Sequence, residues 1–426
     1  MVFDSSHILT ACRAICDSLG GFFRDPAVLW ILITVAVGAA GFRAVYALCF
    51  SPLRRIPGPL LARLTSMRIE MAGLTGTFAA YGKKGAEQYG DIYVCHPSGV
   101  CITDPADIRQ VLSSSLFLKG PYYSLLRITG IDNAISVTHP EGASRSRRML
   151  GPFFSTSYIS RMEPLIAEYG MGAITRRWDA LLGGSSDGTT TVNYGLTFSL
   201  CTFNVISRLV YGQDIAALDP SSSGESFRWV HQSTNYISIR TLLQLLPRLL
   251  FRLLTWPWEH LYRRFSDHVH ESIDARKQLL ASLGAGSERP ADLLQALLDC
   301  EDPKSRVRLT SEQIHAESLL LLLGGTDPTA FSLIWAMHLL MLYPECRRRA
   351  TREVRSNFPP SDETEITYAA ARSALPYLEA CILESMRLVP VPSVMIPRVV
   401  RSPGATIKGH YLPPGTHVFA NIYGSH

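Results

Sequence analysis

The chain has 426 residues, of which 47% are hydrophobic and 18% are charged, so it can bury a large core. The formal net charge is only +5, and the lysines and arginines are scattered, which argues against nucleic acid as a partner. An acidic protein partner or an anionic membrane surface suits this charge better. The nine cysteines include no CxxC pair, so neither a zinc site nor a disulfide framework is indicated.

The first long apolar stretch, residues 28–50, predicts a transmembrane helix. It is apolar except for Thr34 and Arg43, and it is long enough to cross the hydrocarbon core of a bilayer. A buried core helix is the alternative reading of the same pattern. Basic residues after the stretch favour a cytosolic body, with residues 1–27 in the lumen. These basic residues are Arg54, Arg55 and Arg63.

Residues 51–62, SPLRRIPGPLLA, predict a hinge between the membrane helix and a globular domain that spans residues 63–426. Three prolines lie in this short segment. Proline fixes its backbone dihedral and removes an amide donor, so the hinge is expected to be stiff.

Beyond the hinge, the pattern predicts a mainly α domain with a small β part. The clearest strand pattern is residues 92–104, where two apolar runs flank Pro97-Ser98-Gly99 in the manner of a hairpin. Long segments with helical periodicity follow, separated by short polar loops. The main ones are residues 197–211, 226–254 and 258–282.

Residues 245–258, LLPRLLFRLLTWPW, combine leucine bulk with arginines and two tryptophans. This composition suits a surface that dips into lipid headgroups, and it equally suits a buried core helix. Both interpretations stay open from the residues alone.

A helix of unusual length is predicted to begin near Thr310 and to run to Pro344. Thr310 and Gln313 match a capping box ahead of a long apolar run. Such a length suggests that the helix crosses the whole domain.

The middle of this predicted helix contains GGTDPTA, residues 324–330. Two glycines and a proline weaken a helix, so a local kink is expected where a ligand can approach the backbone. Asp327 and Thr329 place a carboxylate and a hydroxyl at this point. The alternative is a strained helix with a solvated aspartate.

A second candidate is Glu384 with Arg387, three residues apart on one helical face. The same spacing occurs at Glu225 and at Glu345, but only the Glu384 copy lies in an apolar helix. Unpaired charges are costly in apolar surroundings, so we expect a fixed pair or triad there.

Six segments of the sequence, taken in chain order, resemble those of a microsomal cytochrome P-450. The resemblance is strongest to the monooxygenases of filamentous fungi, including those of secondary metabolism. The resemblance covers nearly everything from residue 28 to residue 426. The segments are SPLRRIPGP, YGDIYV with ITDPADIRQVL, HPEGASRSRRMLGPFF, GGTDPTA, ESMRL with PSVMIPR, and YLPPGTHVFANIYGSH.

The resemblance implies a cytochrome P-450-like fold and a haem-dependent monooxygenase that oxidises a lipophilic small molecule. It implies haem b as the cofactor and NADPH-cytochrome P-450 reductase as the electron donor. It also implies a single-pass protein of the endoplasmic reticulum membrane, with its body facing the cytosol.

The family's site residues carry over in part. Asp327 matches the acid of the proton-delivery pair, but Pro328 stands in place of the alcohol, and Thr329 follows it. Arg147 and Arg398 match arginines that contact the haem propionates. Glu384 and Arg387 match the structural pair that supports the haem-binding core.

The family's axial cysteine lies in a loop downstream of a segment like ANIYGSH, where this sequence ends. A thiolate ligand is what favours oxygen–oxygen cleavage at the iron. Cys381 lacks the glycine-rich loop of that ligand and is interpreted as a core residue. Cys346, beside Arg347 and Arg349, has a basic environment that favours a thiolate, but nothing places it under a haem. We therefore expect a fold that is incomplete at its C-terminus, no metal ligand, and no activity of the chain as written.

Two origins would give this pattern, a truncated gene model or a genuine short protein. The alternative function is a noncatalytic, membrane-anchored pseudoenzyme or remnant that binds a ligand or a partner.

Overall fold

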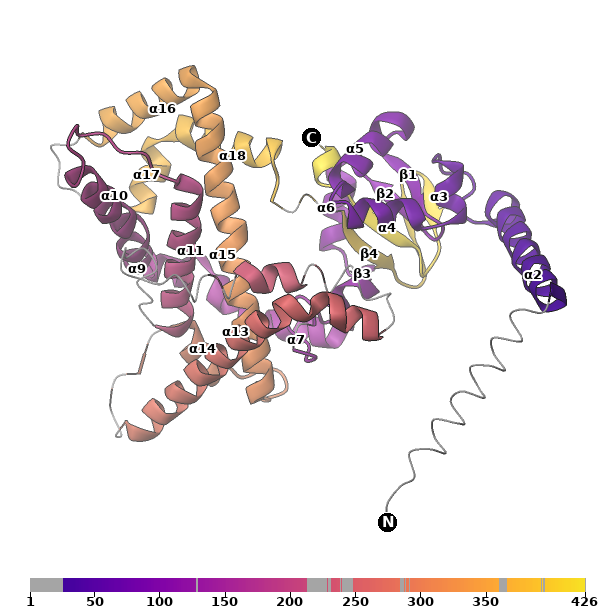
Figure 1. The fold of residues 1–426 in the computed structure, drawn as a ribbon, viewed down its shortest axis with the longest axis horizontal. Coiled ribbons are helices and arrows are strands. Elements are labelled where there is room, and N and C mark those ends of the chain that lie inside the picture. Colours follow the sequence, from indigo (N-terminus) through magenta and orange to yellow (C-terminus); the bar gives the residue numbers. More distant parts are fainter. Residues whose placement is uncertain are drawn as a thin grey trace, which may run out of the picture.

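The computed structural model describes residues 26–127, 129–212, 228, 231–237, 239, 248–283, 287, 289–290, 292–359, 366–391, 393 and 395–425. The chain is mostly helical with a small β part, as predicted (Figure 1). Most of the segment predicted to be lumenal, and much of the predicted helix 226–254, lie outside the described residues.

An apolar helix, α2 (Pro26–Val45), continues into a single π-helical turn, η1 (Tyr46–Phe50), and projects from the body (Figure 1). Trp30, Phe42 and Phe50 are 69%, 76% and 71% exposed. A buried core helix would cover such side chains, so that alternative is wrong. Residues Ile33–Phe50 are a candidate membrane span by length and composition.

The segment after the candidate span folds back onto the body. Leu53 and Ile56 are buried, and the Arg63 guanidinium donates to the carbonyl oxygens of Leu53 and Ile56. These contacts hold the proline-containing segment against the first helix of the body, α3 (Leu60–Leu64).

Strands from the two ends of the body form one five-stranded sheet. The predicted hairpin is confirmed: β1 (Ile92–His96) pairs antiparallel with β2 (Gly99–Ile102), with a bulge between Val94 and His96. The sheet order is β1-β2-β7-β4-β3. The other strands are β3 (Phe117–Lys119), β4 (Ile396–Val400) and β7 (His417–Ala420), and β5 (Ala405–Ile407) pairs with β6 (His410–Leu412).

Short helices flank this sheet. They are α4 (Met67–Leu74), α5 (Phe78–Tyr89) and α6 (Pro105–Ser113). The Asp104 side chain accepts hydrogen bonds from Ala106 N and Asp107 N and so caps α6. The Lys408 ammonium lies 3.0 Å from Asp91 and 3.1 Å from Asp104, which ties the β5–β6 turn to this part of the chain.

The remaining helices form a larger helical part around α11 (Tyr194–Tyr211) and α15 (Ser311–Leu342), which pack side by side (Figure 1). Phe203 of α11 and Leu319 of α15 are buried in the same core cluster. The other helices are α7 (Pro140–Leu150), α8 (Thr156–Arg161), α9 (Glu163–Ile166), α10 (Ala173–Gly183), α13 (Arg248–Ser282), α14 (Leu293–Asp299), α16 (Pro344–Asn357), α17 (Tyr368–Ala374) and α18 (Pro376–Leu388).

The start of the long helix is confirmed, because Thr310 caps α15 and Gln313 completes the capping box. The helix is continuous through all seven residues of GGTDPTA. A Cβ at Gly325 would lie 2.6 Å from the Ile206 side chain, so this glycine permits the close approach of α11 and α15.

The predicted break between residues 254 and 258 is wrong, because α13 continues through Pro257. An interior proline costs about 3 kcal/mol. The 35-residue length of α13 and its packing against α15 offset that cost.

Candidate functional site

Asp327 lies on α15 and is half-buried. Its Oδ2 accepts a hydrogen bond from Thr234 Oγ1 at 2.8 Å, and its Oδ1 lies 3.8 Å from His231 Nδ1. Both partners belong to the helical segment 231–237. The carboxylate therefore faces that segment, where a hydroxyl and an imidazole orient it.

Thr329 is exposed on the same helix. Two residues along an α-helix differ by about 200° in direction, so Thr329 and Asp327 lie on opposite sides of α15. The uninterrupted helix at Pro328 does not rotate one toward the other. The structure thus does not bring the acid and the hydroxyl together.

Three cations gather between the sheet and the helical part. Lys119 of β3 and Arg398 of β4 are cross-strand partners. Arg398 donates a hydrogen bond to the Tyr123 hydroxyl, and its guanidinium carbon lies 5.3 Å from the centre of the Tyr123 ring. Arg147, near the end of α7, is close enough to Lys119 to influence its charge.

The pKa of Lys119 is affected by the other two cations of this cluster. Burial lowers the pKa of the Lys119 ammonium, and the charges of Arg398 and Arg147 lower it further. The ammonium donates to Ala134 O at 2.6 Å and to Ile135 O at 3.1 Å, and none of the three cations has a salt bridge among the described residues. Such a cluster favours the binding of an anion.

The sequence indicated two members of this cluster, Arg147 and Arg398, and missed Lys119 and Tyr123. Strand pairing brings Lys119 beside Arg398, although 279 positions separate them in the chain. A single lysine in a short strand carries no signal of such a partner.

Glu384 and Arg387 of α18 form a salt bridge with nitrogen–oxygen distances of 2.6 and 2.7 Å. The expected pairing is present, but the expected apolar enclosure is not. Their side chains are 53% and 43% exposed, and neighbouring Leu383 and Met386 are exposed as well. An exposed pair of this kind contributes little to stability.

Burial disfavours a thiolate at several of the described cysteines. Burial raises the pKa of the Cys95, Cys101 and Cys201 thiols, which opposes thiolate formation. Burial is also the main cause that raises the pKa of Cys381, which lies beside Tyr377 on α18. The remaining described cysteines are Cys49, Cys300 and Cys346.

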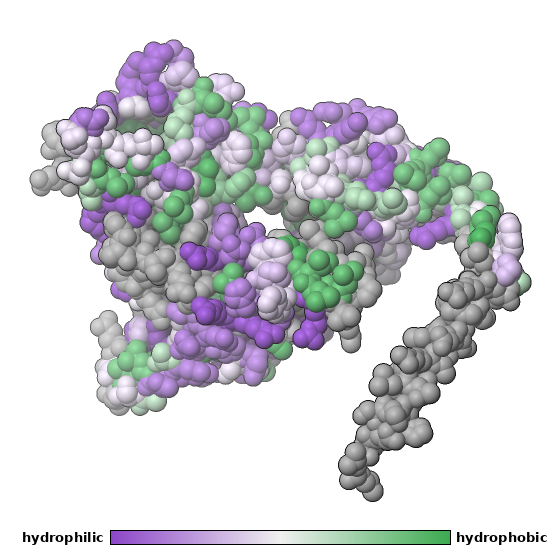
Figure 2. All heavy atoms as spheres, in the orientation of Figure 1, coloured by the Kyte–Doolittle hydropathy of each residue, from purple (hydrophilic) through white to green (hydrophobic). Residues whose placement is uncertain are grey.

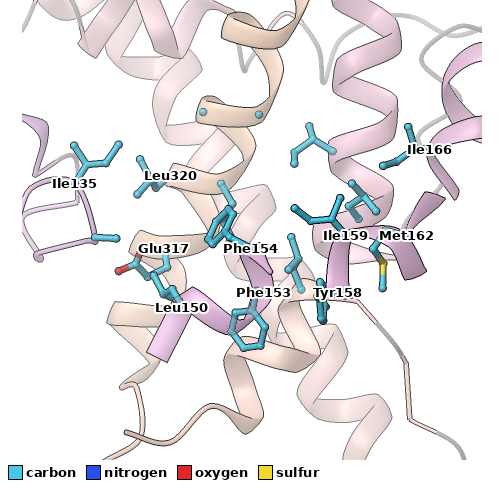
Figure 3. Close-up of a pocket in the computed structure, with 17 residues that line it drawn as sticks. Ile135, Leu150, Phe153, Phe154, Tyr158, Ile159, Met162, Ile166, Glu317 and Leu320 are labelled. Carbon is cyan, nitrogen blue, oxygen red and sulfur yellow. The ribbon is translucent and has the colours of Figure 1, made fainter. Parts of the chain in front are cut away.

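An apolar cavity of about 450 Å³ lies between α15, α11 and the α7–α9 region (Figure 3). Phe153, Ile159 and Met162 form part of its wall, and Gly324 and Gly325 of α15 contribute bare backbone. This volume suits a small lipophilic molecule.

Glu317 is the acidic group among the described residues that line this cavity, and it is 4% exposed (Figure 3). Burial raises the pKa of Glu317 to about 7, while the backbone of Ala134 and the charge of Lys119 oppose this shift. The carboxyl can therefore donate a hydrogen bond into the cavity below neutral pH. Our sequence reasoning missed this residue, although a charge ahead of LLLLL was a visible signal.

Comparison with known proteins gives consistent matches. The family model described as cytochrome P450 matches residues 58–426. Cytochrome P450 monooxygenase helB1 of Aspergillus fumigatus is 40% identical over 401 residues, which are 94% of this chain and 68% of that protein. Cytochrome P450 monooxygenase helB3 of the same fungus is 38% identical over 399 residues, covering 93% of this chain and 76% of that protein.

A solved structure agrees with this fold. The crystal structure of the cytochrome P450DA heme domain aligns with a TM-score of 0.65 at 18% identity, over 81% of this chain and 72% of that one. At this identity, the likeness concerns the fold alone.

Proposed function

Because the chain belongs to the cytochrome P450 family, we propose that its function by descent is haem-dependent oxidation of a lipophilic small molecule of secondary metabolism. The observation that carries the proposal is the cation cluster of Lys119, Arg147 and Arg398. Three cations that form no salt bridge within the described residues suit a cofactor that carries two carboxylates, and haem b has two propionates.

Haem with a cysteinate ligand supplies oxygen activation when it is bound. In this proposal the cation cluster would hold the propionates, and Tyr123 would position Arg398 through its hydroxyl. We propose that none of the described thiols serves as the ligand of the iron. We propose that the 426-residue polypeptide does not perform the oxidation by itself.

Asp327 is the candidate for proton delivery, and Thr234 holds its carboxylate in place. Thr329 is the candidate alcohol of the pair, and it would act only after a local change of α15 that turns its hydroxyl toward the acid. Glu384 and Arg387 are proposed as the structural pair that supports the neighbouring core.

Spectroscopy of the purified full chain tests this proposal. We expect no thiolate band in the reduced, carbon-monoxide difference spectrum after incubation with haem. Binding of haem through its propionates should still appear as a Soret shift, and Arg398→Gln should weaken it. A thiolate band with stoichiometric haem would overturn the proposed inactivity, and a Soret shift that Arg398→Gln leaves unchanged would remove the cation cluster from the haem site.

A second candidate function is a noncatalytic, membrane-anchored protein that binds a lipophilic ligand. The cavity of about 450 Å³ with Glu317 in its wall favours this reading. Saturable binding of a fluorescent lipophilic probe to the haem-free protein would support this second function. A failure of such probes to bind would exclude it.

The proposed redox partner is NADPH-cytochrome P-450 reductase, and the proposed location is the endoplasmic reticulum membrane with the body in the cytosol. The helix α16 presents a run of basic side chains that suits an acidic partner surface. They are Arg347, Arg348, Arg349, Arg352 and Arg355.

A further inference from the structure

Basic residues outnumber acidic residues next to the candidate membrane span of this protein. Residues 43–85 contain seven basic residues and one acidic residue, Glu70, whereas the whole chain has a net charge of only +5. This basic segment therefore accounts for the entire positive excess. Its basic residues are Arg43, Arg54, Arg55, Arg63, Arg68, Lys83 and Lys84.

Apolar side chains are exposed within the same basic segment. On α3, Leu60 is 66% exposed, and on α4, Met67 and Met71 are 62% and 49% exposed. Helix α2 contacts α3, and its own apolar side chains lie exposed beside this region (Figure 2). Exposed apolar groups interleaved with cations are typical of a surface that meets lipid headgroups.

A small cavity opens between α4, α5 and β1, and the basic segment supplies part of its lining. Its volume is about 40 Å³, and Arg68, Tyr81, Lys84 and Tyr89 are among the residues that line it. The guanidinium carbon of Arg68 lies 6.0 Å from the centre of the Tyr81 ring. Neither Arg68 nor Lys84 has a salt bridge with another described residue.

The Tyr81 hydroxyl oxygen is buried and has no hydrogen-bond partner among the described residues. A buried hydroxyl without a partner is costly, so a hydrogen-bond acceptor that enters the cavity would lower this cost. Burial is the main cause that raises the pKa of Tyr81 to about 12, so the phenol remains a proton donor at neutral pH. Two cations and one hydroxyl donor match the oxygens of a phosphate.

We propose that this cavity binds the phosphate of an anionic phospholipid from the membrane that holds α2. Arg68 and Lys84 supply charge, Tyr81 donates a hydrogen bond, and the exposed side chains of α3 and α4 lie among the acyl chains. The lipid would fix how the body sits on the bilayer. Membrane lipid is favoured over free phosphate because the cavity adjoins exposed apolar surface and the candidate span.

Native mass spectrometry of the full chain in a non-ionic detergent tests the proposal, with phosphatidic acid, phosphatidylcholine and inorganic phosphate as probes. Phosphatidic acid should bind more tightly than phosphatidylcholine, and inorganic phosphate should compete weakly. Arg68→Gln and Lys84→Gln should each weaken phosphatidic acid binding about five-fold, as expected for one cation near an anionic lipid. Tyr81→Phe should also weaken it, without lowering the melting temperature of the lipid-free protein.

Lys83→Gln is the matched control, because it removes the same charge from the neighbouring position. The Lys83 ammonium lies 5.8 Å from the Tyr423 ring centre, and Lys83 does not line the cavity. We expect Lys83→Gln to change binding less than about two-fold, since only the general charge is lost. Equal effects of Lys83→Gln and Lys84→Gln, equal binding of the two lipids, or full competition by inorganic phosphate would each overturn the proposal.

Discussion

Glu317 and Asp327 are two carboxylates of one helix that the structure places in different surroundings. Asp327 has a hydroxyl donor at 2.8 Å and an imidazole at 3.8 Å. Glu317 lies in an apolar wall, where burial disfavours its charge and only the Ala134 backbone and Lys119 compensate. Neutral Glu317 can donate a hydrogen bond to a ligand in the cavity. The carboxyl loses this proton as the pH rises, so ligand binding in the cavity is expected to depend on pH.

Glu317→Gln is predicted to reduce the pH dependence of folding stability. The pKa of Glu317 is raised from 4.5 to about 7 in the folded protein. Between these two pH values the folded protein keeps the proton of Glu317, whereas the unfolded chain has lost it. The residue's contribution to the free energy of unfolding therefore falls as pH rises through this window, by about 2 kcal/mol between pH 5 and pH 8. Urea unfolding at several pH values measures it. A wild-type slope that persists unchanged in the variant would contradict the assignment.

At the scale of single elements, the N-terminus, the first half and the middle of α15 are stabilised in different ways. Its N-terminus is fixed by the Thr310–Gln313 capping box, and its first half is buried in the helical core. Its middle contains two glycines with different surroundings. A Cβ at Gly325 would lie 2.6 Å from Ile206 Cγ1, whereas a Cβ at Gly324 would meet nothing within 4 Å. Packing against α11 thus requires one glycine and not the other.

Gly325→Ala is predicted to destabilise the protein by about 1–3 kcal/mol, because the added methyl overpacks the contact with α11. Ile206→Ala in the same chain should recover part of the loss, since it removes the atoms that clash. Gly324→Ala is the control and should be neutral or stabilising by up to about 1 kcal/mol, because alanine favours the helix. Thermal and urea unfolding measure all three. Equal losses for the two glycines would refute this account.

At the scale of the whole molecule, segments from opposite ends of the chain build the sheet, and the helices between them form the larger part (Figure 1). The cation cluster lies where these two parts meet, because β3 and β4 bring Lys119 beside Arg398 and α7 contributes Arg147. The start of α13 carries exposed Leu253 and Trp256, at 66% and 73% exposure. These side chains favour the membrane-contact interpretation of residues 245–258, in the part that the structure describes.

Trp256 is predicted to reach the bilayer in the full chain reconstituted into vesicles. Brominated lipids quench tryptophan that enters the headgroup and acyl region, so Trp256→Phe should remove a quenched component of the emission. Trp178→Phe is the control, because the Trp178 indole nitrogen is buried inside the helical part. If both variants lose the same quenched fraction, α13 does not contact the membrane.

The sequence by itself determined the family, the mostly helical class, the β1–β2 hairpin, and the N-terminal candidate span. These follow from local composition, periodicity and ordered motifs, which neighbours far along the chain do not alter. The capping box at Thr310 is equally local, because both of its hydrogen bonds lie within one turn.

Only the tertiary structure decided the rest. It showed that α15 is not interrupted at GGTDPTA, that the Glu384–Arg387 pair is exposed, that Lys119 joins Arg398, and that Glu317 and Tyr81 are buried. The pKa of Glu317 and the free space around Gly325 are set by atoms that lie more than a hundred residues away in the chain. No local pattern in the sequence contains those distances.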